Sequence, residues 1–198
     1  KYKMKNISLK NRVLMAPMTR SRSGGNSIVN NIITNYYEQR ATAGLIISEA
    51  TQISLQGQGY SNTPGIYSED QINSWKLVTK AVHEKGGKII LQLWHVGRVS
   101  SSKVNGLQPI APSALIAKDT KVYVFNTPTS KDATMIPVES PRAMNKDDLL
   151  QVIKEFKQAS RNAIDTGFDG VEIHAVNGYL LDQFLRSNSN KREDSYGG

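Results

Sequence analysis

The chain has 198 residues, of which 38% are hydrophobic and 21% are charged, and its formal net charge is +8. This composition argues against disorder, and no apolar run approaches the roughly 20 residues that a membrane-spanning helix needs. The absence of cysteine excludes disulfides, thiolate metal sites and cysteine nucleophiles, and it fits a reducing compartment. We therefore expect a cytoplasmic protein with no membrane partner.

The positive charge raises the question of nucleic-acid binding. The Lys and Arg residues are scattered along the chain, with no basic stripe interleaved with aromatic residues and no recognised binding motif. A solvated basic surface explains this pattern better, so we expect no nucleic-acid partner. Such a surface would still help to attract a phosphorylated cofactor.

Four short apolar segments predict strands. They are residues 12–18, 44–51, 88–94 and 168–175, and each is a nearly continuous apolar run. Such runs are typical of parallel strands that are buried on both faces. Pro17 lacks a backbone N–H, so it ends regular pairing in the first segment.

Helical patterns lie between the predicted strands. Residues 32–43 form a weaker candidate, whereas Ser68 and Gln71 form a capping box that starts a helix closed by Gly86 and Gly87.

A longer helix is predicted from Asn145, which acts as its N-cap, to Gly167, which stops it. Its apolar stripe consists of Leu149, Ile153, Phe156, Ala163 and Ile164.

The order of elements predicts an α/β fold with a parallel sheet. Residues 98–143 form a long excursion after the third strand, rich in Ser, Pro and Asn, and the alternating patch 121–125 suits part of a surface hairpin. In a barrel this excursion would be a lid or a pocket wall. A doubly wound sheet is the competing architecture, and the lack of a Gly-rich fingerprint after the first strand disfavours it.

Polar residues at the carboxyl ends of the predicted strands are the site candidates, because sites of parallel α/β folds lie there. The ends carry Thr19, Glu49, Thr51, Gln92, Trp94, His95 and His174. They show no metal-ligand spacing, so we expect no metal. Glu172 shares a strand face with His174, and it suits either a buried, hydrogen-bonded residue or one that supports a site residue, rather than a catalytic one.

His174, Asn177 and Tyr179 form the densest polar group, directly after the fourth strand. A lone His after a strand is more often structural, but this clustering favours a functional site. His83 lacks clustered partners and reads as a surface residue, and His95 stays undecided. No Ser nucleophile elbow appears. The neutral donors and aromatic residues suit a planar heteroaromatic cofactor and an electron-poor substrate.

Three segments carry a family resemblance: LKNRVLMAPMTR, LQLWHVGR and VEIHAVNGYLLDQFLRSNSNKREDSYGG. They resemble the old yellow enzyme family of FMN-dependent ene-reductases, in its N-ethylmaleimide reductase-like or oxophytodienoate reductase-like branch. The resemblance runs from about Tyr2 to Gly198. It implies a (β/α)8 TIM barrel, non-covalent FMN, NAD(P)H as hydride donor and small electron-poor alkenes as substrates.

The resemblance also implies roles for individual residues. Thr19 would hydrogen-bond a flavin carbonyl, and Ala50 and Gln92 would grip the pyrimidine edge. The residues implied on the cofactor side are Ala16, Pro17, Met18, Thr19, Ala50, Gln92 and His174. His174 and Asn177 would bind the substrate oxygen, Tyr179 would protonate the alkene carbon, and Tyr60 and Trp94 would be pocket walls.

This chemistry is physically consistent. Hydride addition to an α,β-unsaturated carbonyl builds negative charge on its oxygen, so two preorganised neutral donors there favour the transition state. A phenol keeps its proton at neutral pH and can deliver it to carbon.

Four strands are half of an eight-stranded barrel, so residues 1–198 are expected to be the N-terminal half of one FMN-binding domain, with the C-terminal half absent. The usual barrel phosphate site would lie in that half, so we expect this chain to be inactive alone. The alternative is a non-catalytic half-barrel that needs its other half to bind FMN. A lyase or aldolase would need a Schiff-base Lys or metal carboxylates, and neither is found. A homo-oligomer stays open.

Overall fold

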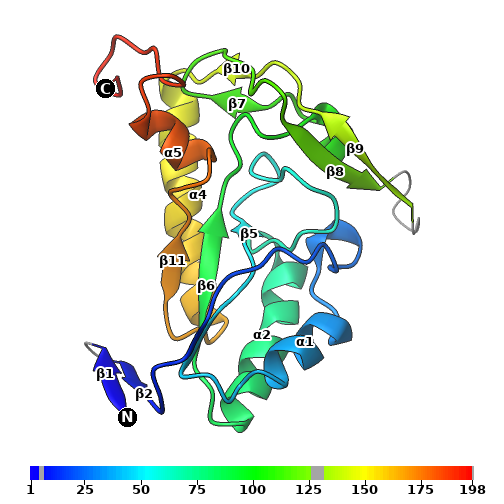
Figure 1. Ribbon diagram of the computed structural model, residues 1–198, viewed down its shortest axis with the longest axis vertical. Helices are drawn as coiled ribbons and strands as arrows, with labels where there is room; N and C mark the ends of the chain where they lie inside the picture. Colours follow the sequence, from blue (N-terminus) through cyan, green and yellow to red (C-terminus); the bar gives the residue numbers. More distant parts are fainter. Residues whose placement is uncertain (5–6, 126–131, 198) are drawn as a thin grey trace. The chain divides into compact units, whose positions relative to one another are not determined.

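A computed structural model describes residues 1–4, 7–125 and 132–197 of the chain (Figure 1). The residues form two compact units. The first unit consists of Lys1–Ile53, Asn62–Leu93 and Phe156–Ile173. The second consists of Ser54–Ser61, Trp94–Glu155 and His174–Gly198, of which Gly198 itself lies outside the described residues.

A parallel sheet is the framework of the first unit. Its strands follow the order β11-β6-β4-β3, and β5 (Thr51–Gln52) also pairs with β6. The bounds are Leu14–Met15 for β3, Leu45–Ile47 for β4, Ile89–Trp94 for β6 and Val171–Ile173 for β11. All three pairings along this order are parallel. The predicted parallel sheet is confirmed, although all four of its predicted strands are shorter than their apolar runs.

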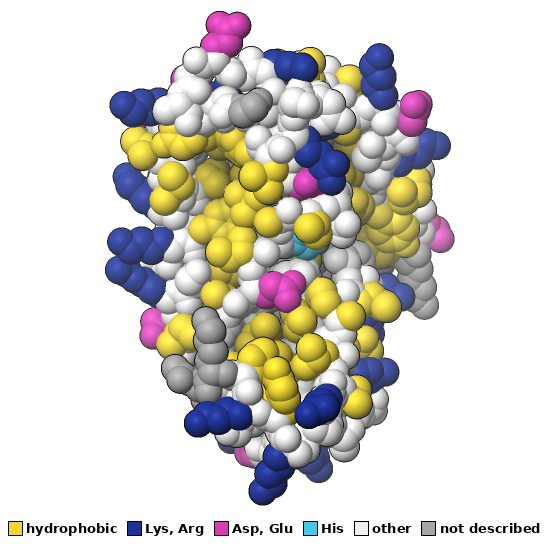
Figure 2. Space-filling model, turned by 60° about the vertical axis from the view of Figure 1, so that its left-hand side comes forward, with side chains coloured by type: hydrophobic (Ala, Val, Ile, Leu, Met, Phe, Trp, Pro, Cys, Tyr) yellow, Lys and Arg dark blue, Asp and Glu magenta, His cyan; other side chains and the backbone are white. Residues whose placement is uncertain are grey.

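Burial differs between the centre of this sheet and its edges. Leu45, Ile46 and Leu91 on the central strands are buried, whereas Leu14 is 52% and Ile173 is 51% exposed. The prediction that all four strands are buried on both faces is therefore wrong for β3 and β11. Among the described residues, no strand pairs with the outer side of either. Figure 2 shows hydrophobic side chains gathered on one face of the surface.

The two helices of the first unit begin at side-chain caps. Asn30 accepts hydrogen bonds from the N–H groups of Ile32 and Ile33 and starts α1 (Asn31–Glu38). Ser68 and Gln71 form the predicted capping box of α2 (Glu69–Glu84). The helix predicted over 32–43 ends early, because residues 39–43 form turns.

Trp75 lies at the centre of the first unit's core. Its side chain is fully buried, and its Nε1–H donates to the carbonyl of Gly65 at 3.0 Å. The rings of Tyr37 and Phe168 lie 6.2 Å and 5.4 Å from it, centroid to centroid. Trp75 therefore connects α2 to the segments that carry Tyr37, Gly65 and Phe168.

Helix α4 (Lys146–Asp165) begins as predicted, because Asn145 Oδ1 accepts from the N–H of Asp148 at 2.9 Å. The predicted apolar stripe is wrong for Ile153 and Ile164, which are 53% and 57% exposed. The buried apolar positions are Leu149, Val152, Ala159 and Ala163. At about 100° per residue, the two exposed isoleucines lie about a quarter turn away from these four.

Asp169 gives the first unit a polar cluster that was not predicted. Its carboxylate lies 2.9 Å from His83 Nε2 and 2.6 Å from Lys88 Nζ, and it accepts from the N–H of Ile89. Burial alone would raise the pKa of Asp169, but these hydrogen bonds hold it below its usual value. The expectation that His83 has no clustered partner is wrong, since Asp169 is distant in sequence.

The remaining elements of the first unit are short. Strands β1 (Tyr2–Met4) and β2 (Ile7–Leu9) pair antiparallel, and a 3-10 helix covers Gly25–Ser27. None of these was expected from the apolar pattern.

The second unit holds most of the predicted excursion. Strands β8 (Lys121–Phe125) and β9 (Ala133–Pro137) pair antiparallel, which confirms the hairpin strand predicted at 121–125. Residues 126–131 of the excursion lie outside the described residues. The other elements are α3 (Ser102–Asn105), β7 (Ile110–Ala111), β10 (Arg142–Ala143) and α5 (Leu180–Leu185). Within the described part of the chain, no helix is long and apolar enough to span a bilayer.

Candidate active site

The turn that follows β11 carries the polar group His174, Asn177 and Tyr179. The strand ends at Ile173, two residues before the predicted end. Asn177 and Gly178 then adopt left-handed backbone conformations, with φ of +61° and +76°. Asn and Gly tolerate this region best, which explains their presence at a sharp reversal. The reversal makes Tyr179 the N-cap residue of α5.

Four of the predicted site residues meet in an aromatic cluster around Trp94 in the second unit. The Tyr60 ring stacks on Trp94 at 5.8 Å with an interplanar angle of 11°, and the Tyr179 ring meets Trp94 edge-on at 5.1 Å. The His174 ring lies 6.5 Å from Trp94 and 5.0 Å from Tyr179. The fold thus brings together three separate stretches of sequence. Asn177 is exposed beside them in the chain.

The phenols of Tyr60 and Tyr179 are in direct contact. Their oxygens lie 3.3 Å apart, and either hydroxyl can be the donor. Burial raises the pKa of Tyr179 well above its usual value, and the hydrogen bond with Tyr60 raises it further. Tyr179 therefore holds its proton at physiological pH and suits a proton donor rather than a base.

Gln183, in the first turn of α5, holds the segment between β11 and α5 in place through hydrogen bonds to backbone groups. Its Nε2 donates to the carbonyls of Gly178 at 2.7 Å and Val96 at 3.0 Å, and its Oε1 accepts from the N–H of Arg98 at 3.2 Å. The side chain is 1% exposed. Gly97 has a φ of +62°, and a Cβ there would meet the Gln183 amide, so glycine suits this position best.

Asp182 also binds the backbone of Gly178, at its N–H group. Its Oδ2 accepts from the N–H of Gly178 at 2.8 Å, and Arg186 Nε lies 2.9 Å from its carboxylate. Burial opposes ionisation of Asp182, but these bonds hold its pKa below the usual value. The sequence pattern predicted no role for Asp182 or Gln183. Of the α5 leucines, Leu180 is buried and Leu185 is 75% exposed.

His95, left undecided from the sequence, is a structural residue. It is fully buried, its Nδ1 accepts from the N–H of Gly97 at 3.1 Å, and its carbonyl accepts from the N–H of Leu180 at 3.0 Å. Burial lowers the pKa of its imidazole to about 3, so it is neutral. It therefore supports the start of α5 and does not exchange protons at neutral pH.

The predicted cofactor-side residues of the first unit present neutral groups. Ala16, Met18 and Thr19 are exposed on a segment without regular structure, whereas Ala50 and Gln92 are buried. Pro17 between them is half-buried. Gln92 Nε2 donates to Glu172 Oε1 at 2.6 Å. Glu172 is hydrogen-bonded as predicted but half-buried rather than buried, and its bond orients the Gln92 amide.

Glu49 links two of these cofactor-side stretches. Its buried carboxylate accepts from the N–H of Arg20 at 3.2 Å and from the hydroxyl of Tyr37 at 3.3 Å. Burial raises the pKa of Glu49 to about 7, although the bonds from Arg20 and Tyr37 oppose the rise. Arg20 follows Thr19 and Glu49 precedes Ala50, so this carboxylate holds both positions in place. The sequence pattern showed only a carboxylate at a strand end.

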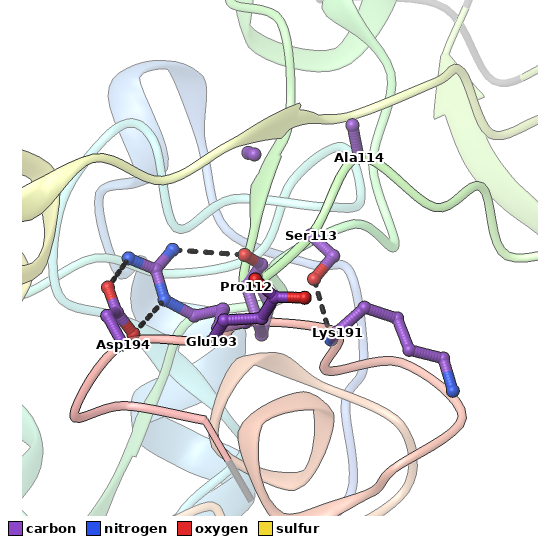
Figure 3. A pocket seen from close by; sticks show the side chains of 8 residues that line it. Pro112, Ser113, Ala114, Lys191, Glu193 and Asp194 are labelled. Carbon is purple, nitrogen blue, oxygen red and sulfur yellow. Dashed lines mark hydrogen bonds and ion pairs between the residues drawn. The ribbon is translucent and has the colours of Figure 1, made fainter.

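A separate hollow of about 360 Å³ lies in the second unit (Figure 3). It is lined by Pro112, Ser113, Ala114, Ala143, Lys191, Arg192, Glu193 and Asp194. Arg192 Nη1 donates to the carbonyls of Pro112 and Met144 and its guanidinium pairs with Asp194. Asn190 Nδ2 donates to the carbonyl of Tyr196. These contacts of Arg192, Asp194 and Tyr196 hold the loop in place, and among the described residues none of the aromatic cluster around Trp94 lines the hollow.

Comparison with known proteins identifies the family. The sequence model described as the NADH:flavin oxidoreductase / NADH oxidase family matches residues 2–198. The chain belongs to this family. One relative, 12-oxophytodienoate reductase 1 of Oryza sativa subsp. japonica, is 46% identical over 198 residues, covering 100% of this chain and 49% of the relative. Another, flavin oxidoreductase hxnT of Emericella nidulans, is 46% identical over 202 residues, covering 97% and 49%.

Solved structures agree with this family. Morphinone reductase superposes with a TM-score of 0.92 at 49% identity, covering 98% of this chain and 51% of that protein. The old yellow enzyme homologue from Zymomonas mobilis gives 0.90 at 45% identity, covering 96% and 51%. The chain thus spans about half the length of the relatives it matches. It has the fold of the N-terminal half of their TIM barrel, as predicted.

The family uses FMN as its cofactor and NAD(P)H as its hydride donor. The donor set of this chain fits a flavin ring. Thr19 and Gln92 offer neutral hydrogen-bonding groups to ring carbonyls and nitrogens, and Ala16, Met18 and Ala50 offer small or flexible apolar contacts. No group of three or more His, Asp or Glu able to hold a metal occurs in the described ranges.

Proposed function

We propose that this chain is part of an FMN-dependent ene-reductase that uses NAD(P)H to reduce the C=C bond of α,β-unsaturated carbonyl or nitro compounds. The observation that carries this proposal is the cluster of Tyr60, Trp94, His174 and Tyr179. It combines an aromatic surface for a flat substrate, a neutral donor candidate and a phenol that keeps its proton. Bound FMN would supply the hydride.

His174 and Asn177 would bind the substrate oxygen. As hydride adds to the β-carbon, negative charge builds on the carbonyl or nitro oxygen, and two preorganised donors bind this anion better than the substrate. Each such donor contributes on the order of 3 kcal/mol in comparable oxyanion sites. Removing both side chains should weaken the binding of phenol-like ligands, because the oxygen of such a ligand resembles that of the substrate anion.

Tyr179 would protonate the α-carbon. Its raised pKa keeps the proton in place until the substrate anion forms, and the carbanionic carbon is then a strong enough base to take it. In the first unit, Thr19 and Gln92 would hold the flavin carbonyls and ring nitrogens, and Ala16, Pro17 and Met18 would lie against the ring.

We further propose that activity needs a complete barrel. The relatives are about twice as long as the matched region, and the sheet of the first unit has unpaired outer sides on β3 and β11 within the part that the structure describes. The second candidate function is therefore a half-barrel that binds no FMN without the rest of the barrel. Small electron-poor alkenes would be the substrates, and the cytoplasm the compartment.

Flavin titration separates the two candidates. The 198-residue chain and the longest polypeptide that contains it are each titrated with FMN, and the absorbance near about 450 nm is followed through gel filtration. Roughly stoichiometric FMN on the longer polypeptide, with enone-dependent oxidation of NAD(P)H, supports the ene-reductase. A longer polypeptide that stays colourless and leaves enones unreduced would contradict it. FMN retained by the 198 residues alone would contradict the need for a complete barrel.

A further inference from the structure

We propose that Tyr60 and Tyr179 form a two-proton relay, in which Tyr60 passes its hydroxyl proton to Tyr179 while Tyr179 protonates the substrate carbon. This inference rests on the proposed function and gives Tyr60 a role beyond that of a pocket wall. The contact that carries it is the 3.3 Å hydroxyl pair.

The environment of Tyr179 creates the need for a relay. Burial is the main cause of the raised pKa of Tyr179, so a phenolate left on Tyr179 would be costly. The Tyr60 hydroxyl lies 3.3 Å from the Tyr179 hydroxyl, so it is placed to give Tyr179 a proton as Tyr179 loses its own. Tyr60 is half-buried and can recover a proton from water.

The Tyr60 ring is held in the geometry that this transfer requires. It stacks on Trp94 at 5.8 Å and 11°, its carbonyl accepts from Gln58 Nε2 at 3.1 Å, and the next residue, Ser61, donates its N–H to the carbonyl of Tyr123. A Cβ at Gly59 would lie 2.5 Å from the Val99 carbonyl, so the chain passes closely there. The ring is therefore fixed before substrate arrives, which lowers the cost of ordering it.

The hydroxyl distance suits a relay that tightens during the reaction. Neutral O–H···O bonds are most often about 2.7–2.8 Å long, and catalytic hydrogen bonds are commonly longer before the substrate binds. As Tyr179 loses its proton, the bond from Tyr60 becomes charge-assisted and shorter. The interaction is thus stronger in the transition state than in the ground state, which is the condition for catalysis.

The transfer balances as follows. The substrate anion formed by hydride addition gives an electron pair to the Tyr179 proton, forming the C–H bond. The Tyr179 O–H electrons stay on oxygen and take the Tyr60 proton, leaving a phenolate on Tyr60. That phenolate takes a proton from water, and the hydroxide produced offsets the proton taken up by the product.

A nitroalkene tests the relay, because its nitronate anion is stable enough for hydride addition and protonation to be followed as separate steps. Single turnovers of the FMN-loaded full-length polypeptide are recorded by stopped flow at alkaline pH, with protein in excess. For Tyr60→Phe we expect nitronate formation within about twofold of the original protein and nitronate protonation slowed at least about tenfold. Tyr179→Phe should slow the same step, and Tyr196→Phe is the matched control that should slow neither.

The number of protons that move in the protonation step can be measured as a second test. The protonation rate is followed against the deuterium fraction of the solvent, and we expect a curved dependence for the original protein and a linear one for Tyr60→Phe. Equal losses in both steps would reduce Tyr60 to a pocket wall, and an unchanged protonation rate would also overturn the relay. If the original protein produces neither nitronate nor nitroalkane, the ene-reductase proposal itself fails, which is a different result.

Discussion

The two units hold their candidate residues by different means. In the first unit, Ala50 and Gln92 lie on or beside parallel strands whose backbone bonds and buried side chains fix them. In the second, the turn before Tyr179 is fixed by side chains that bond to backbone groups, chiefly Asp182 and Gln183. Ala50 and Gln92 thus rest on regular structure, whereas Ala16, Met18 and Thr19 do not, and the candidate Tyr179 follows a turn that individual polar side chains hold in place. A turn permits close approach to a substrate, but its geometry then depends on each of the side-chain hydrogen bonds that hold it.

The largest expected effect concerns chemistry in the second unit alone. We expect Tyr179→Phe in the FMN-loaded full-length polypeptide to slow enone reduction by about 10²–10⁴-fold, because a positioned general acid contributes that much. Oxidation of NAD(P)H in the other half-reaction should change little, since it needs no proton from Tyr179. Stopped-flow measurement of both half-reactions tests this, and an equal loss in both would remove Tyr179 from the proton-donor role.

In the first unit, the largest loss of stability is expected from removing a side chain of the packed core. Trp75→Ala should lower the free energy of unfolding by about 3–5 kcal/mol, the usual cost of truncating a buried aromatic residue. Urea unfolding followed by circular dichroism measures it. Leu77→Ala on the same helix is the control, because Leu77 is 56% exposed and should cost little. Similar losses in both variants would contradict a packed core around Trp75.

Glu49 predicts a pH dependence that belongs to the first unit. Its folded pKa of about 7 lies above the ordinary value of 4.5, so between these values the folded state binds more protons than the unfolded state. Stability is therefore fully present below about 4.5 and falls as pH rises through about 7, by no more than about 3 kcal/mol. Glu49→Gln should remove this slope from urea midpoints measured across the window. A slope equal in both proteins would mean that Glu49 does not titrate there.

The smallest expected effect concerns Gln183, whose hydrogen bonds hold the turn before Tyr179 in the second unit. Gln183→Leu loses three hydrogen bonds and should destabilise by about 2 kcal/mol, measured by urea unfolding. It should also slow enone reduction more than it weakens FMN binding, because the pinned turn carries Tyr179. Gln151→Leu, on the exposed face of α4, is the control. If FMN affinity fell as much as the enone rate, the division of roles between the units would be wrong.

Elements with local signals were predictable. The α2 capping box, the parallel order of the main strands and the strand at 121–125 follow from neighbouring residues. The pairing of β1 with β2 and the cluster around Asp169 carry no such local signal, because their partners are chosen by packing. The exposed Ile153 and Ile164 show the same limit, since an apolar pattern marks a helix but does not fix which side is covered.

The sequence by itself determined the parallel α/β class and the polar group at His174, Asn177 and Tyr179, because apolar runs and turn residues act over a few positions. Only the tertiary structure decided that Tyr60 meets Tyr179, 119 residues away, and that Gln183 holds the turn between β11 and Tyr179. Periodicity reports that a face is buried, but the partner that covers it depends on how distant segments pack. Side-chain hydrogen bonds depend on that packing even more strongly, since they need atoms within about 3.5 Å.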